Sequence, residues 1–93
     1  MITDVRISAR AQKQLRKVPA HVVGKLYVWV ELVATDGLEE ARKIPGYHDE
    51  PLRGDRAGQR SIRLNRAYRA FYSIMSDGTV EFVSVEEVNK HEY

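Results

Sequence analysis

The chain has 93 residues, 43% of them hydrophobic, which fits a single compact domain over residues 1–93. It contains no cysteine, and this excludes a disulfide framework, a thiolate metal site and a cysteine nucleophile. Fifteen basic and 13 acidic residues leave a net charge of only +2, so the total charge does not by itself predict a nucleic-acid partner.

The N-terminal residues 1–8 do not show a basic segment followed by an apolar run, and no stretch approaches the ~20 apolar residues of a membrane span. The sequence therefore predicts a soluble, cytoplasmic protein without a membrane partner. Residues 2–7 alternate between apolar and polar side chains, which predicts a short edge strand. Ser8 is a typical N-cap, and we expect a helix from there to about residue 17, where Pro19 prevents continuation.

A second helix is predicted from apolar residues that recur at helical spacing. These residues are Val22, Leu26, Trp29, Val30 and Val33. Asp36 and Gly37 end this run, and a further short helical turn is expected over residues 38–43 before Pro45 breaks it.

From Arg60 onward, apolar side chains alternate with polar ones, which predicts antiparallel strands. Turns are expected at residues 65–67 and 76–78, so a last strand should cover residues 79–88. This order predicts an α+β fold with two N-terminal helices packed on a small, mainly antiparallel sheet of about four strands. The other face of the sheet is expected to be free, with arginines projecting from it.

A three-residue turn at residues 65–67 would pair Ile62 with Ala70 toward the helices and place Arg63 beside Arg69 on the free face. Neighbouring like charges are unfavourable unless an anion lies between them, which favours phosphate binding there. Phe71 interrupts the alternation of apolar and polar residues. We interpret it as a residue that stacks on an RNA base or makes a contact at the edge of the sheet.

Basic residues are concentrated in residues 53–69, which hold six arginines and a single acid, Asp55. This stretch is the candidate surface for RNA phosphates. The six are Arg53, Arg56, Arg60, Arg63, Arg66 and Arg69.

Residues 50–69, EPLRGDRAGQRSIRLNRAYR, resemble the middle of the RelE/ParE toxins, especially their HigB-like and YoeB-like members. In those toxins a GDRxGxxSIR pattern leads through a turn to an arginine that opens a strand, as Arg69 does here. The C-terminal residues 89–93, NKHEY, are similar to the histidine- and tyrosine-bearing end of these toxins. The motifs cover about half of the chain, and the predicted order of elements extends the likeness to a RelE-like two-layer domain.

The resemblance implies the toxin of a type II toxin–antitoxin system. Its implied activity is that of an endoribonuclease that cleaves mRNA on the ribosome without a metal or cofactor, and its implied partner is a cognate antitoxin protein. RNA cleavage through the RNA's own 2′-hydroxyl needs a base, an acid and cations near the phosphate, all of which side chains can supply.

Glu50 matches the YoeB-like general base, and His48 is a competing base two residues earlier. Arg69 matches the arginine that holds the scissile phosphate, a task for which the planar guanidinium is suited. Arg53 stands where the family often has lysine. With Arg56 and Arg63, it is expected to bind RNA phosphates.

The general acid is expected at the C-terminus. His91 has an unperturbed pKa of ~6.5, which suits proton donation at neutral pH. Tyr93 could stack on a base or orient the phosphate. Glu92 separates two residues that are adjacent in YoeB-like toxins, so which of them acts as the acid stays open. Lys90 is a further expected phosphate contact.

Three other interpretations remain. A ParE-like toxin would share the fold but act on DNA gyrase, and the joint presence of Glu50, Arg69 and His91 argues against it. A non-catalytic RNA- or ribosome-binding module would use the arginines for electrostatic affinity alone. The arginines could also form only a solvated face, which salt-insensitive behaviour toward RNA would indicate.

Overall fold

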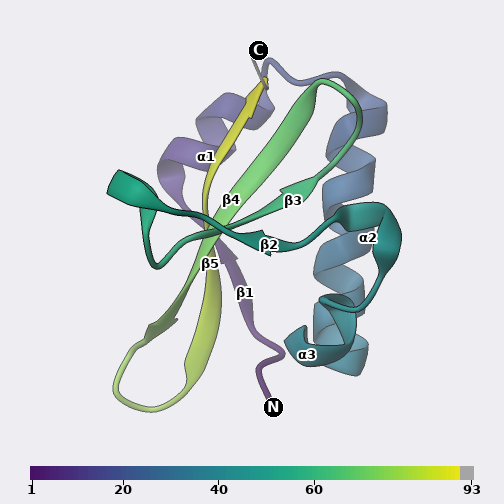
Figure 1. The fold of residues 1–93 in the computed structure, drawn as a ribbon. Coiled ribbons are helices and arrows are strands. Elements are labelled where there is room, and N and C mark those ends of the chain that lie inside the picture. Colours follow the sequence, from purple (N-terminus) through teal and green to yellow (C-terminus); the bar gives the residue numbers. More distant parts are fainter. Residues whose placement is uncertain (91–93) are drawn as a thin grey trace.

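The structure is a computed structural model that describes residues 1–90. Helices cover one face of a five-stranded sheet in the order β1-β5-β4-β3-β2 (Figure 1). The elements along the chain are β1 (Val5–Ile7), α1 (Ala9–Leu15), α2 (Ala20–Asp36), α3 (Leu38–Ala41), η1 (Pro45–Tyr47), β2 (Glu50–Pro51), η2 (Gly54–Arg56), β3 (Arg60–Arg63), β4 (Tyr68–Ser76) and β5 (Glu81–Lys90), of which η1 and η2 are short 3₁₀ helices. Strand β1 runs parallel to β5, and the other neighbours are antiparallel. The α+β two-layer prediction is confirmed, with one more strand than expected because the two-residue β2 pairs with β3.

Ser8 caps α1 as predicted, because its Oγ accepts a hydrogen bond from the Ala11 N–H at 3.0 Å. The same hydroxyl donates to the Glu86 carbonyl at 3.1 Å, and the Gln14 side chain accepts from the Val88 N–H at 2.7 Å. The helix is therefore fastened to β5 at both of its ends. It stops at Leu15, two residues before the expected end.

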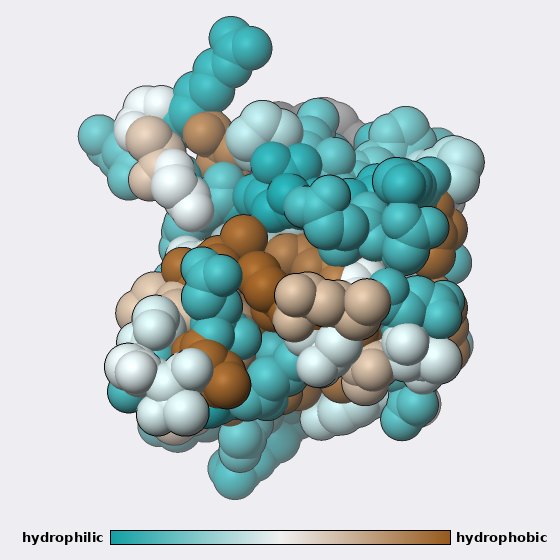
Figure 2. Space-filling view, turned by 90° about the horizontal axis from the view of Figure 1, so that it is seen from below, coloured by the Kyte–Doolittle hydropathy of each residue, from teal (hydrophilic) through white to brown (hydrophobic). Residues whose placement is uncertain are grey.

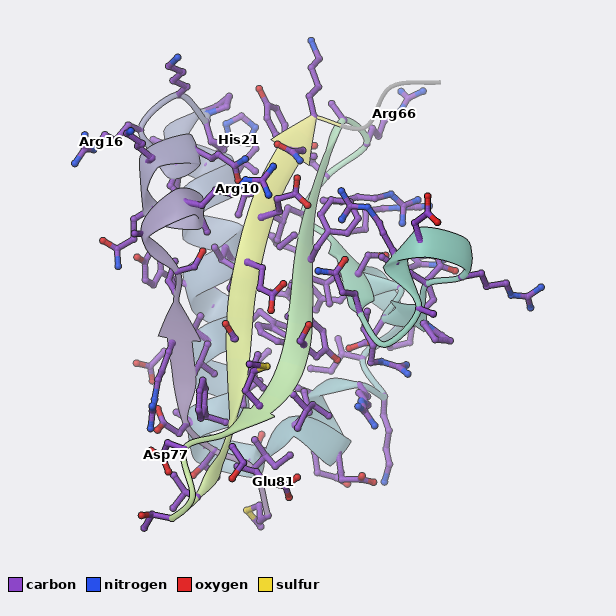
Figure 3. All side chains as sticks on the ribbon, turned by 90° about the vertical axis from the view of Figure 1, so that its left-hand side faces the viewer. Arg10, Arg16, His21, Arg66, Asp77 and Glu81 are labelled. Carbon is purple, nitrogen blue, oxygen red and sulfur yellow. The ribbon has the colours of Figure 1, made fainter. Side chains whose placement is uncertain are left out.

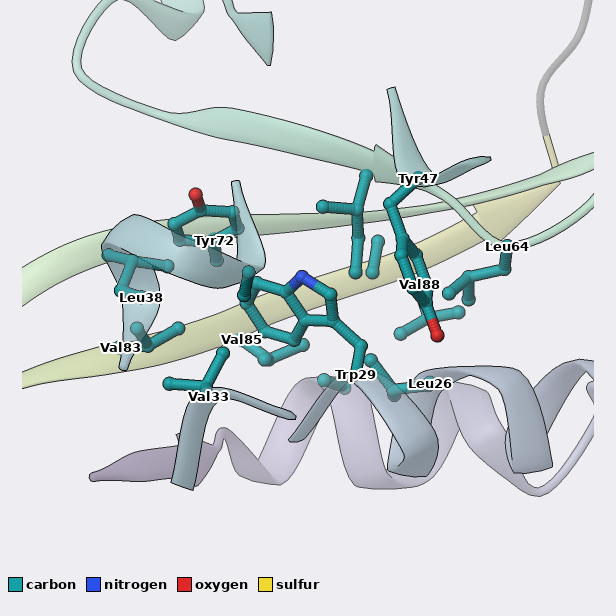
Figure 4. Packing of buried hydrophobic residues seen from close by; sticks show 14 of the residues in the cluster. Leu26, Trp29, Val33, Leu38, Tyr47, Leu64, Tyr72, Val83, Val85 and Val88 are labelled. Atoms are coloured by element: carbon teal, nitrogen blue, oxygen red, sulfur yellow. The ribbon is translucent and has the colours of Figure 1, made fainter. Parts of the chain in front are cut away.

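The predicted apolar stripe of α2 faces the sheet (Figure 4). Val22, Leu26, Trp29 and Val33 are fully buried, while Val30 is partly buried against the same core. The Trp29 ring lies 5.2 Å from the Tyr72 ring of β4, tilted by 45°. In the described part of the chain, no helix has the length and apolar character needed to cross a membrane.

The β3–β4 register is the one that the three-residue turn predicts. Ile62 pairs with Ala70, and Arg63 pairs with Arg69. The Asn65 side chain fixes the turn, because its Oδ1 accepts hydrogen bonds from the N–H groups of residues 67 and 68 at 2.8 and 2.7 Å.

A β-bulge in β5 was not expected. Phe71 pairs with Glu87 and Tyr72 pairs with Val85, so Glu86 is an extra residue in β5. The bulge reverses the alternation of β5 at this point. As a result, Val85 and Val88 both face the core although three positions separate them.

The face opposite the helices is less free than expected, because residues 53–59 lie over part of it. The Arg56 guanidinium carbon is 4.4 Å from the centre of the Phe71 ring. Phe71 thus points away from the core and makes a cation–π contact, which explains its interruption of the alternation.

Candidate functional site

Side chains from β2 to β5 form two adjacent rows on the sheet face opposite the helices, here called the open face. Strand register places Glu50, Ser61, Phe71 and Glu87 in one row and Arg63, Arg69 and Asn89 in the next. The sequence predicts Glu50, Arg63 and Arg69 as functional residues and leaves out the polar Ser61, Glu87 and Asn89.

Glu50 and Arg69, which are 19 positions apart, are in contact on the open face. Arg69 Nη1 lies 3.2 Å from Glu50 Oε1 and 3.4 Å from Ser61 Oγ. The Arg69 side chain is only 15% exposed, whereas that of Glu50 is 57% exposed. Within residues 1–90, the Arg69 guanidinium forms its hydrogen bonds through Nη1 alone, so the other N–H donors of this five-donor group can bind a phosphate.

Asp49, directly before Glu50, is held in the protein interior. Its Oδ2 accepts a hydrogen bond from the Tyr72 hydroxyl at 2.6 Å, and its Oδ1 accepts one from Arg60 Nε at 2.7 Å. The Asp49 side chain has no exposed surface. Burial, together with the bond to Asp49, raises the pKa of Tyr72 to about 12. Because Asp49 is fixed in this way, the next residue, Glu50, is presented at the surface.

His48, the competing base, is an exposed residue with left-handed backbone geometry, φ 44°. The hydrogen bonds and ion pairs within residues 1–90 include none from its side chain. Of the two predicted bases, Glu50 is therefore the one that contacts Arg69.

Glu87 is the centre of a second charged cluster on the open face. Its carboxylate forms ion pairs with Arg56 Nη2 at 2.7 Å and Arg10 Nη2 at 3.0 Å, and it accepts a hydrogen bond from Asn89 Nδ2 at 2.8 Å. Burial opposes ionisation of Glu87, but the hydrogen bonds from Arg56 and Asn89 and the two nearby positive charges outweigh it and lower its pKa. Figure 3 shows Arg10 extending from α1 toward β5.

Sequence reasoning missed Glu87. The sequence does contain a sign of the bulge that positions it. Val83, Val85 and Val88 are all apolar, and a regular strand cannot bury all three on one face because the last interval is three residues. Arg56, a predicted RNA ligand, is already bonded to Glu87 and covers Phe71. A phosphate at this position would have to compete with the Glu87 carboxylate or bind alongside it.

The remaining predicted phosphate ligands differ in position. Arg63 lies directly beside Arg69 and is partly buried. Arg53 is exposed at the start of η2, and Lys90 is exposed at the end of β5, opposite Tyr68. His91 and Tyr93 lie outside the described residues, so their roles stay predictions. In the described part of the chain, no three His, Asp or Glu side chains are placed to hold a metal ion.

Known structures with similar folds cover nearly the whole chain. The YoeB/ParE toxin from Agrobacterium tumefaciens is 21% identical with a TM-score of 0.65, and the match covers 96% of this chain and 99% of that one. YafQ from E. coli is 19% identical with a TM-score of 0.68, and here the coverage is 95% and 92%. In the toxin–antitoxin complex RelBE2 from Mycobacterium tuberculosis, the matched chain is 25% identical with a TM-score of 0.60, with 98% and 100% covered.

Neither a family model nor a curated protein sequence matches the chain. The structural likeness nevertheless extends over 95–98% of the chain. The chain thus has the α+β fold of these solved structures. More narrowly, this is the RelE/YoeB-like fold of the RelE/ParE superfamily, as the sequence motifs predict.

Proposed function

We propose that this chain is the toxin of a type II toxin–antitoxin system and that it cleaves mRNA as a metal-independent endoribonuclease on the ribosome, in the cytoplasm. The observation that carries the proposal is the contact of the exposed Glu50 carboxylate with the Arg69 guanidinium at 3.2 Å. In this contact, a carboxylate that can accept a proton lies beside a guanidinium that can bind a phosphate, and Arg63 pairs with Arg69 on the neighbouring strand. This is the pairing that cleavage through a 2′-hydroxyl requires.

In the proposed reaction, Glu50 removes the proton from the 2′-hydroxyl, and the resulting 2′-oxygen forms a bond to phosphorus. The bond from phosphorus to the 5′-oxygen breaks, and a C-terminal acid, His91 or Tyr93, protonates that leaving oxygen. The products are a 2′,3′-cyclic phosphate and a 5′-hydroxyl. Arg69 and Arg63 stabilise the negative charge that accumulates on the phosphate oxygens.

Two further observations support the toxin role. The solved structures with this fold include a protein described as a YoeB/ParE toxin, and the toxin–antitoxin complexes RelBE2 and DinJ-YafQ. We therefore propose a cognate antitoxin as the protein partner, in addition to mRNA and the ribosome. Arg53 and Lys90, both exposed, are proposed to contact RNA phosphates outside the reacting group.

The test is primer extension on a defined mRNA translated in a cell-free system with purified protein. Wild type should cut within codons at the ribosomal decoding site. Arg69→Ala should lower the cleavage rate by about 100-fold or more, the usual effect of removing one group that stabilises transition-state charge. Glu50→Gln should also be slow and should lose the acidic limb of the pH–rate profile.

Arg66→Ala is the matched control, because Arg66 is an exposed arginine in the β3–β4 turn (Figure 3), outside the Glu50–Arg69 contact. It should cleave at nearly the wild-type rate. Intact transcripts with wild-type protein would refute the ribonuclease proposal. Because one similar structure is described as a YoeB/ParE toxin, gyrase supercoiling would then be assayed with the same protein. Ribosome binding without cleavage would instead indicate a non-catalytic module.

A further inference from the structure

The guanidinium of Arg56 lies over the Phe71 ring on the open face. Its central carbon is 4.4 Å from the centre of that ring, which is a cation–π contact. Arg56 belongs to η2 and Phe71 to β4, so the contact joins the loop over the open face to the sheet. The Arg56 side chain nevertheless stays 42% exposed. The ring therefore occupies one side of the guanidinium, and the opposite side is accessible.

Two partners at the edge of the Arg56 guanidinium fix its orientation. Nη2 forms an ion pair with Glu87 at 2.7 Å, and Nη1 donates to Gln59 Oε1 at 3.2 Å. Both partners are held in turn, because the Glu87 side chain is only 8% exposed and Gln59 Nε2 donates to Glu86 Oε2 at 2.8 Å. A guanidinium that is already fixed in this way loses little side-chain freedom when a ligand binds to its free side.

The charges around Arg56 are balanced, which makes it a poor ligand for a phosphate. Glu87 contacts both Arg56 and Arg10, and Glu86 is reached through Gln59. The cluster thus combines two guanidinium groups with two carboxylates, and a phosphate bound to Arg56 would be repelled by the carboxylates. An uncharged ligand would meet no such repulsion. The free side of Arg56 is therefore suited to a flat, uncharged group.

The Arg56–Phe71 pair lies next to the proposed reacting groups. Phe71 is two residues from Arg69 on β4, a separation of ~7 Å, and both side chains are on the open face. Ser61 connects the two positions, because it pairs with Phe71 on the neighbouring strand and its Oγ is 3.4 Å from Arg69 Nη1. A nucleotide whose phosphate lies against Arg69 can therefore place its own base, or that of its neighbour, on Arg56.

We propose that the free side of Arg56 is a stacking platform for one base of the RNA, within one nucleotide of the scissile phosphate. Nucleobases are flat and uncharged, and they stack on arginine guanidinium planes as they do on aromatic rings. Arg56 contacts the substrate in this arrangement, whereas Phe71 and Glu87 are positioning residues that hold its plane. The inference rests on the proposed ribonuclease function, and it gives Arg56 a role other than the phosphate contact that the basic residues 53–69 predict.

A double-mutant cycle between protein and RNA tests the platform. Ribosomes are programmed with short mRNAs in which one base near the cleavage position is replaced by hydrogen, one position at a time, and single-turnover cleavage rates are measured. The protein variant is Arg56→Lys, which keeps the charge and can still pair with Glu87 but has no plane on which a base can stack. At one position, base removal should slow wild type at least about 5-fold, the lower limit for one base stack, and Arg56→Lys by less than about 2-fold.

Phe71→Leu is a second variant, which tests the support and leaves Arg56 in place. It keeps an apolar side chain beneath the guanidinium but removes the ring, so the dependence on the same base should fall. The melting temperature of each variant is measured alongside. A contact that only fastened the loop to the sheet would change the melting temperature and leave the dependence on that base as it is in wild type.

Arg6→Lys is the matched control, because Arg6 forms the same kind of contact with Phe82, 3.8 Å from its ring centre. Phe82 pairs with Met75, which is four residues further along β4 than Phe71, or ~13 Å away. Apolar surface is visible at this end of the molecule, which holds the N-terminus (Figure 2), and Met75 is exposed there. Removal of any one base should slow Arg6→Lys by the same factor as wild type.

The other outcomes distinguish the platform from the ribonuclease function. Cleavage with the same base dependence in wild type and Arg56→Lys at every position overturns the platform and leaves the ribonuclease standing. Arg56 would then act through its charge or hold the loop. Loss of base dependence in Arg6→Lys as well would show a general change of the fold, and this also overturns the platform. If wild type cleaves none of the mRNAs, the proposed function fails and the platform fails with it.

Discussion

Two adjacent carboxylates, Asp49 and Glu50, have different environments. The Asp49 side chain is fully buried and bonded to Tyr72 and Arg60, whereas Glu50 is exposed and touches Arg69. An ionised buried carboxylate is tolerable only when donors satisfy it, and Tyr72 and Arg60 are those donors. Asp49 thus serves to hold the chain, and Glu50 keeps the exposed carboxylate that its proposed role as general base requires.

Tyr72→Phe tests the role of the Asp49 bonds. It removes a hydrogen bond to a charged, buried acceptor and should lower the free energy of unfolding by about 2 kcal/mol in urea at pH 7. Tyr68→Phe, at a partly buried tyrosine of the same strand, should change it by less than about 0.5 kcal/mol. Equal effects of the two changes would show that the bond to Asp49 contributes little.

The same bond predicts alkaline behaviour. The pKa of Tyr72 is raised from 10.0 to about 12, so the folded state holds this proton more tightly than the unfolded state. The associated stability is complete below pH 10 and is lost as the pH rises from 10 to about 12. Tyrosinate absorbance of wild type should therefore include a late step, which Tyr72→Phe removes. A late step that persists in Tyr72→Phe would assign it to another tyrosine.

At the residue scale, the sequence predicts the parts of the site that a local motif marks. Glu50 and Arg69 follow from residues 50–69, and the Arg63–Arg69 neighbourhood follows from the turn length. Glu87 and Asn89 were missed because their position depends on the β5 bulge. Ser61 was missed because nothing in the sequence distinguishes a serine that is buried at the site from any other serine in a strand.

Among the elements, those defined by periodicity and caps were predicted well. Helix α2 has its expected buried stripe, and α1 starts at its Ser8 cap. Strand β2 has only two residues, too few to show a period, so it could not be predicted. The loop over residues 53–59 was also missed, because its position depends on contacts of Arg56 and Gln59 with Glu86 and Glu87, far along the chain.

Ser8→Ala tests how α1 is joined to the sheet. It removes the bond to the Ala11 N–H and the bond to the Glu86 carbonyl, so the loss should exceed that of a simple cap. We expect about 1–2 kcal/mol in urea unfolding. Ser8→Asp keeps the cap acceptor but cannot donate to Glu86, and should fall between wild type and Ser8→Ala. If Ser8→Asp equals Ser8→Ala, the cap itself contributes nothing.

At the scale of the whole molecule, the ion pairs of Glu87 connect elements that are far apart in the sequence. It binds Arg10 of α1 and Arg56 of η2, and Asn89 of its own strand completes the cluster. Glu87→Gln leaves two arginines without their anion and should lower the free energy of unfolding by about 2 kcal/mol at pH 7. This is less than the ~3–5 kcal/mol for breaking a fully buried pair, because both arginine side chains remain partly in solvent.

The effect of Glu87→Gln should depend on pH in a known direction. The pKa of Glu87 is lowered in the folded state from its ordinary value of 4.5, so its contribution is present above pH 4.5 and is lost as the pH falls through the folded-state value. Urea unfolding at pH 7 and pH 3 should therefore show the gap between wild type and Glu87→Gln closing at the lower pH. Glu81→Gln, at an exposed position of the same strand, should show no such closure. A gap that is equal at both pH values would mean that Glu87 stabilises the protein by packing and not by its charge.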